Sequence, residues 1–468
     1  MLCNNMLDDI VKEQVLEKYL NSGDFNGLPF NVLAEKFKTV REAKETIARL
    51  VKEGAIDIIY NTTNPHIKGF DFSKYQEQFL SELLNTPDDL KKEIIPCGNI
   101  KIEICNKYGS FCLYPTKRLL SEKVGYERKY LETPPFTKKL CFGECQLDLV
   151  YFRVDVLDRY IEDPRYYVSY DDYFGRIYFK EFSDEHPDDI YLKYFGLAYN
   201  ITTGENLICA LLCDLHKLNA RHQYHFYSYM EESAPNIIPE ENFFKNQILG
   251  EYAEEHSIFE AFLEEIKIIN KMSNIICNAN LFLKEFSDED RKKLTDFHPF
   301  LKPTQKTFEY FCQTLDKLFS DNLDIKVILK LNELYGSQMQ IDYKQNGEPN
   351  MGSIALLKLF LHTYFKPRSN EEMLKNIFNI WDKRSTGIRA IRSKASHHIR
   401  ENHYDIQIFQ TYQKTIREAY KSIRLIRLIL SNHPDVKNTI LKQNLKIPDW
   451  LFEGKIKTYF ISPIDKTK

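Results

Sequence analysis

The stretch that decides how the C-terminal half of this chain folds is residues 387–405, GIRAIRSKASHHIRENHYD. Within it, four residues separate Arg392 from His397, and five separate Arg392 from His398. Arginine holds phosphate groups and stabilises the negative charge that builds up on them. Histidine takes up or releases a proton near neutral pH. Together, these two residue types predict a site that acts on a phosphodiester.

Strong helical patterns flank this stretch on both sides. Upstream, Ser369 and Glu372 form a capping box that predicts the start of a helix over 370–383. Downstream, apolar residues recur every three or four positions and predict a helix over 405–432. These downstream positions are Phe409, Tyr412, Ile416, Ala419, Ile423, Ile426 and Leu430. The arginine and histidine are therefore expected between two antiparallel helices of a bundle.

In this setting the run Arg392-Ser393-Lys394-Ala395-Ser396-His397 resembles the HEPN superfamily, whose usual core is R-N-K-x-x-H. Ser393 stands where that core has asparagine. The resemblance implies an all-α bundle over 241–434 that cleaves RNA as a homodimer without a metal ion or another cofactor. It also implies a role as a toxin or an antiphage defence effector.

The residue types suggest how such a site would work. His397 would act as the base or as a positioning group and Arg392 would stabilise the phosphate, while Ser393 or Ser396 would donate a hydrogen bond. On one helix, residues five apart differ in direction by about 140°, so Arg392 and His397 would not face each other. We therefore expect two copies of the chain to share one cleft.

His398 is the alternative base. It falls nearer than His397 to the side of the helix defined by Ile388, Ile391 and Ala395, so it is also a candidate core histidine. Further candidate phosphate contacts are Arg389, Lys394, Lys414, Arg417 and Lys421. The last three lie on a basic stripe opposite the apolar seam of the last helix, a pattern that is also typical of a solvated helix face.

Residues 1–69 resemble a winged-helix unit. Thr39 and Glu42 form a capping box that predicts a third helix, and 55–60 predicts the first strand of the wing. The side of the third helix expected to be exposed carries Arg41, Lys44, Arg49 and Lys52, interleaved with Glu42, Glu45 and Glu53. This face would contact DNA or a protein partner, or would simply be solvated.

Residues 70–240 are predicted to form a linker helix followed by a mixed α/β domain. Strands are expected over 100–104, 147–154, 176–179 and 192–199, and a buried helix over 206–217. Cys141, Cys145, Cys209, Cys213 and His216 are residue types that bind zinc, but their spacing favours buried thiols. The run Arg221-His222-Gln223-Tyr224-His225 forms a polar-aromatic cluster that would face a ligand or the bundle, or would be a hydrogen-bonded cluster at a domain interface.

A second resemblance covers about residues 150–433. The pattern Val156-Leu157-x2-Tyr160-x2-Asp163-Pro164-Arg165-Tyr166, together with His222-Gln223, is similar to a group of uncharacterised bacterial proteins. That group implies no established activity.

Composition limits the class of protein. The chain has 468 residues, a net charge of −3 and ten cysteines, which favours a multidomain cytoplasmic protein with free thiols and only local contacts with nucleic acid. No apolar run is long enough to span a membrane. Residues 435–468 are predicted to be a tail that docks through the apolar segment 448–452.

The expected fold class is therefore α+β multidomain, with a winged-helix-like unit, a mixed α/β middle domain and a C-terminal helical bundle. The expected function is a metal-independent endoribonuclease acting on RNA. The alternative is a non-catalytic HEPN-like scaffold or a DNA-binding regulator.

Overall fold

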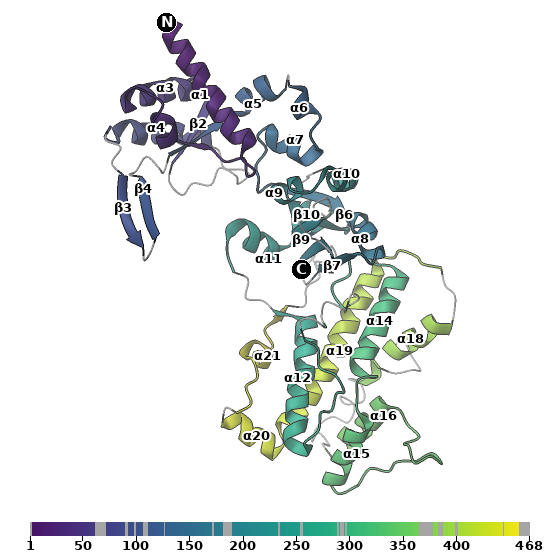
Figure 1. The fold of residues 1–468 in the computed structure, drawn as a ribbon. Coiled ribbons are helices and arrows are strands. Elements are labelled where there is room, and N and C mark those ends of the chain that lie inside the picture. Colours follow the sequence, from purple (N-terminus) through teal and green to yellow (C-terminus); the bar gives the residue numbers. More distant parts are fainter. Residues whose placement is uncertain are drawn as a thin grey trace.

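A computed structural model describes residues 2–60, 72–88, 92–97, 100–105, 111–125, 127–170, 173–180, 190–232, 235–252, 256–287, 290, 294, 297–364, 378–381, 387–397, 401–442 and 444–457. The chain is mixed α+β, as predicted. Helices and a small sheet form the N-terminal part, a larger sheet lies in the middle, and helices dominate the C-terminal part (Figure 1).

The N-terminal unit alternates helices with three short antiparallel strands in the order β1-β5-β2. Thr39 caps the third helix by accepting a hydrogen bond from the Glu42 N–H, as its capping box predicts. The strand β5 lies beyond the predicted boundary at residue 69, so two distant segments close this sheet. Its elements are α1 (Leu2–Asn21), β1 (Leu28–Pro29), α2 (Phe30–Ala34), α3 (Val40–Lys52), β2 (Ile56–Tyr60) and β5 (Phe111–Pro115).

The segment between β2 and β5 contains α4 (Gln76–Asn85) and the hairpin of β3 (Lys92–Cys97) and β4 (Ile100–Cys105). The Gln76 side chain accepts a hydrogen bond from the Ile58 N–H at 2.7 Å and donates one to the Ile58 carbonyl at 3.0 Å. Gln76 thus provides hydrogen-bond partners for main-chain groups on the outer edge of β2, where no further strand of the described residues pairs with them. Three short helices follow β5: α5 (Lys117–Val124), α6 (Arg128–Leu131) and α7 (Pro135–Cys141).

The middle domain is built on an antiparallel sheet in the order β11-β6-β10-β9-β8-β7, with β12 paired to β9. The helices around it are α8 (Asp158–Glu162), α9 (Leu212–His216) and α10 (Ala220–Ser228). The strands are β6 (Leu149–Arg153), β7 (Tyr166–Tyr170), β8 (Phe174–Phe179), β9 (Tyr191–Asn200), β10 (Asn206–Leu211), β11 (Met230–Glu231) and β12 (Ile237–Pro239).

The predicted helix over 206–217 is wrong, because 206–211 forms the strand β10 and only α9 is helical. Residues 207–211 of β10 are all buried, since this strand lies in the middle of the sheet and is covered on both faces. A strand buried on both faces shows a continuous apolar run, and such a run has the same appearance as a buried helix in the sequence.

The C-terminal part is helical, as the apolar periodicity predicts. Predicted helices over 256–275, 304–319, 323–335, 352–365 and 405–432 all form, whereas most of the predicted helix over 370–383, including its capping box, lies outside the described residues. The helices are α11 (Glu241–Phe244), α12 (Ile258–Cys277), α14 (Gln305–Phe319), α15 (Ile325–Leu334), α16 (Ser353–Tyr364), α18 (Ile388–His397), α19 (Gln407–Ser431) and α20 (Pro434–Leu441).

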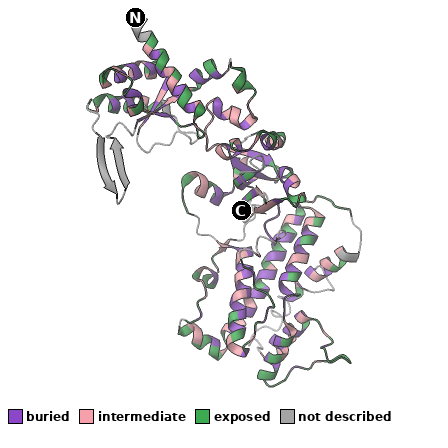
Figure 2. Ribbon diagram, viewed as in Figure 1, coloured by how far each residue is buried: buried purple, intermediate pink, exposed green. Residues whose placement is uncertain are grey.

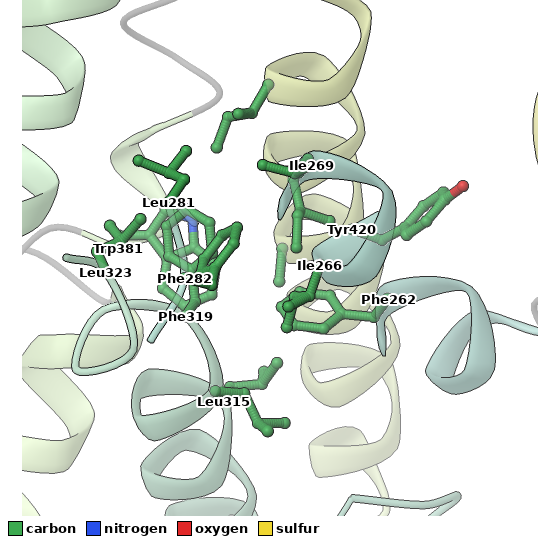
Figure 3. Packing of buried hydrophobic residues seen from close by; sticks show 14 of the residues in the cluster. Phe262, Ile266, Ile269, Leu281, Phe282, Leu315, Phe319, Leu323, Trp381 and Tyr420 are labelled. Carbon is green, nitrogen blue, oxygen red and sulfur yellow. The ribbon is translucent and has the colours of Figure 1, made fainter. Parts of the chain in front are cut away.

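One large apolar core holds these helices together, apart from α11, whose Phe243 packs with residues of the middle sheet. The long helices α12, α14 and α19 carry both buried and exposed residues, and their buried residues form most of this core (Figure 2). Close to the end of α14, Phe319 stacks on Trp381 with ring centroids 4.3 Å apart, among Leu281, Phe282 and Leu323 (Figure 3). This packing supports the turn that follows α14.

A charged pair is buried inside the same bundle. The Arg427 Nε of α19 lies 2.5 Å from the Glu265 Oε2 of α12, and the two side chains are 1% and 0% exposed. Burial raises the pKa of Glu265, although the nearby Arg427 opposes this shift. Each charge therefore depends on the other to remain in the core.

The tail packs on the start of α12. Leu451 of α21 (Asp449–Glu453) is fully buried, and Trp450 stacks on His256 with ring centroids 3.9 Å apart. β14 (Ile456–Lys457) pairs in parallel with β13 (His256–Ser257). The apolar segment 448–452 thus docks on a neighbouring surface, as its composition predicts.

Polar contacts fix the middle domain to the bundle. Lys302 lies 2.7 Å from a carboxylate oxygen of Asp155 and 2.7 Å from one of Asp158, while Asn206 donates hydrogen bonds to the carbonyls of Phe300 and Leu301. Within the described residues, no helix is both long enough and apolar enough to cross a membrane.

Candidate functional site on helix α18

The predicted motif lies on one continuous helix, α18, which packs along α14 (Figure 1). Ile388 and Ala390 are buried, while Ser393 and Lys394 are exposed. His397 is the last residue of the helix, but its side chain and all of His398 lie outside the described residues. Which histidine faces the core therefore stays a prediction. Because Arg392 and His397 share one helix, their directions differ by about 140°.

Arg392 is bound by two aspartates. Its Nη1 donates to the Asp316 Oδ2 at 2.5 Å and to the Asp321 Oδ2 at 2.8 Å. The side chain of Asp316 is 1% exposed, that of Asp321 47% and that of Arg392 33%. The hydrogen bond to Asp316 is the main cause of a raised pKa for Arg392. The guanidinium group is therefore a permanent cation held in one place at the edge of the bundle.

A second arginine shares the buried aspartate. The Nε of Arg389 lies 3.8 Å from the Asp316 Oδ1, an oxygen that accepts no hydrogen bond from the residues that the structure describes. Asp316 and Asp321 together balance the charges of Arg389 and Arg392. This balance weakens the attraction that either arginine exerts on a phosphate.

The aspartates did not enter the sequence prediction, although one of them left a signal. Asp316 occupies a position on the apolar face of α14, between Leu315 and Phe319. A charged residue at a core position needs a partner, because burial of an unpaired charge is costly. The sequence could thus have indicated that Asp316 has a cationic partner, but not which one.

The predicted phosphate contacts on α19 lie on another helix than the motif. Lys414, Arg417 and Lys421 are exposed, and Lys421 lies 2.7 Å from Glu418. α14 lies between α18 and α19 in Figure 1. The basic stripe of α19 and the cations of α18, Arg389, Arg392 and Lys394, therefore lie on two helices that are not neighbours in this view.

The residues with zinc-binding side chains form no metal site within the described ranges, where no group of three or more His, Cys, Asp or Glu side chains could hold a metal ion. Burial raises the pKa of Cys141 and Cys213 to about 11, and it also raises that of the fully buried Cys209. The prediction of buried thiols is confirmed for Cys141 and Cys209, whereas Cys145 and Cys213 are only partly buried.

The cluster around His222 is part of the middle domain's interior. Gln223 accepts a hydrogen bond from the Phe136 N–H and donates to the carbonyls of His216 and Leu218, which ties α10 to α7. His222 is fully buried, and its Nδ1 lies 2.8 Å from the Tyr160 hydroxyl. Burial lowers the pKa of His222 to about 4, so the ring is neutral at physiological pH. These contacts explain the cluster as a structural element of the domain.

The predicted DNA-contacting face of α3 needs a correction. Lys44 was expected to be exposed, but it is only 3% exposed, and its Nζ lies 2.7 Å from the Asp88 Oδ1 and donates to the Thr86 carbonyl. Arg49 also forms an ion pair within the chain, since its Nη2 lies 2.7 Å from the Asp8 Oδ1. The segment around α4, which lies between β2 and β5 in the sequence, therefore covers part of this face of α3.

Comparison with known proteins adds no relative: no family model, no curated protein and no solved structure matches this chain. The chemistry of the site itself must therefore carry any functional assignment.

Proposed function

We propose that the C-terminal bundle is a metal-independent endoribonuclease of the HEPN type. The observation that supports this most is the position of Arg392. Its guanidinium group is partly exposed, is bound by the buried Asp316, and belongs to the same helix as His397. Ser393 and Lys394, exposed beside it, provide a hydroxyl and a second cation for a phosphate. A role in cell toxicity or antiphage defence is part of this proposal.

The proposed reaction is an internal displacement on RNA. His397 removes the proton from a ribose 2′-hydroxyl, and the resulting oxygen attacks the adjacent phosphorus. Arg392 stabilises the charge on the pentacoordinate phosphate. The bond to the 5′-oxygen then breaks, the leaving oxygen takes a proton, and the products are a 2′,3′-cyclic phosphate and a 5′-hydroxyl end.

Incubation of the purified chain with total RNA tests this proposal. The expected result is cleavage into fragments that end in 2′,3′-cyclic phosphate. Expression of the wild type in cells should also be toxic, whereas expression of an Arg392→Ala variant should not. RNA that stays intact in the presence of folded protein would contradict the nuclease assignment.

We also expect a homodimer that cleaves RNA in the presence of EDTA. One chain's Arg392 and His397 diverge on their helix, and a two-fold axis beside α18 would bring both pairs to one cleft. An arginine supplies the positive charge that a metal ion would otherwise provide. Light scattering and cleavage assays with EDTA check the two parts of this prediction. A fully active monomer would contradict the shared cleft, and activity lost on chelation and restored by magnesium would contradict metal independence.

The ion pairs of Arg392 favour a second candidate function, a non-catalytic scaffold or regulator. An arginine that is already bound by two carboxylates of its own chain could serve only to hold α18 on α14. The strand order β1-β5-β2, with α1, α2 and α3 packed around it, supports the winged-helix resemblance on which a regulator would depend.

We expect this chain to bind duplex DNA weakly or not at all. Lys44 and Arg49 are held in ion pairs within the chain, and Arg41 pairs with Glu45 at 3.0 Å, so few cations of α3 remain for phosphates. Fluorescence anisotropy with labelled duplexes at 50 and 200 mM salt checks this. Tight binding to a defined duplex that weakens steeply with salt would favour the regulator instead.

A further inference from the structure

The turn after α14 holds Asp321 beside Arg392 on a rigid backbone. The Asp321 N–H donates to the Asp316 carbonyl at 3.0 Å. The next residue, Asn322, accepts a hydrogen bond from the Lys284 N–H and donates one to the Lys284 carbonyl. Because the backbone is fixed in this way, only rotation of its side chain can move the Asp321 carboxylate away from Arg392.

The two aspartates differ in how firmly they hold the arginine. Asp316 is almost fully buried, so its carboxylate cannot be hydrated in place of the ion pair. Loss of Arg392 would therefore leave an unpaired buried charge. Asp321 is about half exposed, and exposed ion pairs are weak and are screened by salt. Asp316 is therefore the anchor of Arg392, and Asp321 is the contact that can be exchanged.

A carboxylate resembles a phosphate group in the property that matters here, since both present two anionic oxygens to a guanidinium. The Asp321 Oδ2 lies 2.8 Å from the Arg392 Nη1, a distance that a phosphate oxygen could adopt equally well. Arg389 shares the buried aspartate, with its Nε 3.8 Å from the Asp316 Oδ1, so a second cation lies close to the ion pair of Arg392 and Asp316.

We infer that the Asp321 carboxylate occupies the subsite for an RNA phosphate and is displaced from Arg392 when RNA binds, while Asp316 stays in place as the anchor. This inference rests on the proposed function. It makes Asp321 a competitor of the substrate and Asp316 a positioning residue. It also explains how a site with balanced charges can still take up a polyanion.

The test measures binding of a labelled single-stranded RNA by anisotropy, with the full chain carrying His397→Ala so that the RNA is not cleaved. In this background Asp321→Asn should tighten the dissociation constant by about three- to tenfold at 50 mM salt, because an exposed competing ion pair is removed. Asp342→Asn is the matched control. It removes the same charge from an exposed position of the bundle and should leave the dissociation constant unchanged.

A third measurement separates exchange at Arg392 from a general effect of charge. With Arg392→Ala added, Asp321→Asn should no longer tighten binding. A gain that persists without Arg392, an equal gain in the Asp342→Asn control, or no gain from Asp321→Asn would each overturn the inference. Tighter binding by Asp321→Asn with no cleavage by the wild type would support the phosphate subsite and contradict the nuclease.

Discussion

The substitution Arg392→Ala is expected to lower the rate of RNA cleavage by about a hundredfold or more, because it removes the cation that stabilises the phosphate in the transition state. His397→Ala should lower the rate by about 10² to 10⁴, the usual contribution of a general base. The first-order rate of cleavage of a labelled RNA, measured under single-turnover conditions, checks both values.

Two matched variants define what these losses mean. Arg128→Ala removes an arginine that is 88% exposed and pairs with Glu132, far from α18 in the sequence, so cleavage should continue at the wild-type rate. His398→Ala should lower the melting temperature and leave cleavage intact, while His397→Ala should do the reverse. If His398→Ala abolishes cleavage instead, His398 is the base. If both Arg392→Ala and His397→Ala cleave at the wild-type rate, the motif is not the active site.

Arg427→Ala is expected to destabilise the bundle by about 3–5 kcal/mol, because it leaves the carboxylate of Glu265 buried without its partner. Urea unfolding followed by tryptophan fluorescence measures this loss. The chain has two tryptophans, Trp381 and Trp450, and both pack in or against the bundle core, so their signal reports on this part of the chain.

The loss should shrink at acidic pH. Burial raises the pKa of Glu265 in the folded state above its ordinary value of 4.5, and removal of Arg427 takes away an interaction that lowers it. A carboxyl group with a raised folded-state pKa favours folding at low pH, and this contribution is lost as pH rises through that pKa. The difference in the free energy of unfolding between wild type and Arg427→Ala should therefore become smaller as the pH is lowered from 7 to 5.

A double substitution provides the control for this pair. Glu265→Leu combined with Arg427→Met removes both charges and should recover most of the stability, since apolar residues of similar volume often replace buried ion pairs without loss. If the double variant is as unstable as Arg427→Ala, lost packing explains the effect and the unpaired charge does not.

The helical part of the fold follows from local patterns, and this is why its prediction succeeded. In α19 the apolar residues from Tyr412 to Leu430 recur at helical spacing, and each lies within one turn of the next. Thr39 and Thr304 cap their helices through neighbours three residues away. The same approach predicted the wrong element for β10, because its strand conformation depends on pairing with β6 and β9, which lie outside the local sequence pattern.

The candidate site divides in the same way. The sequence alone placed Arg392 and His397 between the helical patterns of 370–383 and 405–432, and it determined that the two side chains diverge by about 140° if they share a helix, because spacing along a helix is a property of neighbouring residues. The structure then shows that both residues lie on α18. Only the tertiary structure decided that Asp316 and Asp321 bind Arg392 and that Asp88 binds Lys44, since these partners lie 76, 71 and 44 residues apart. The strength of an ion pair depends on the distance between the two charges and on their burial, and the local sequence pattern determines neither quantity.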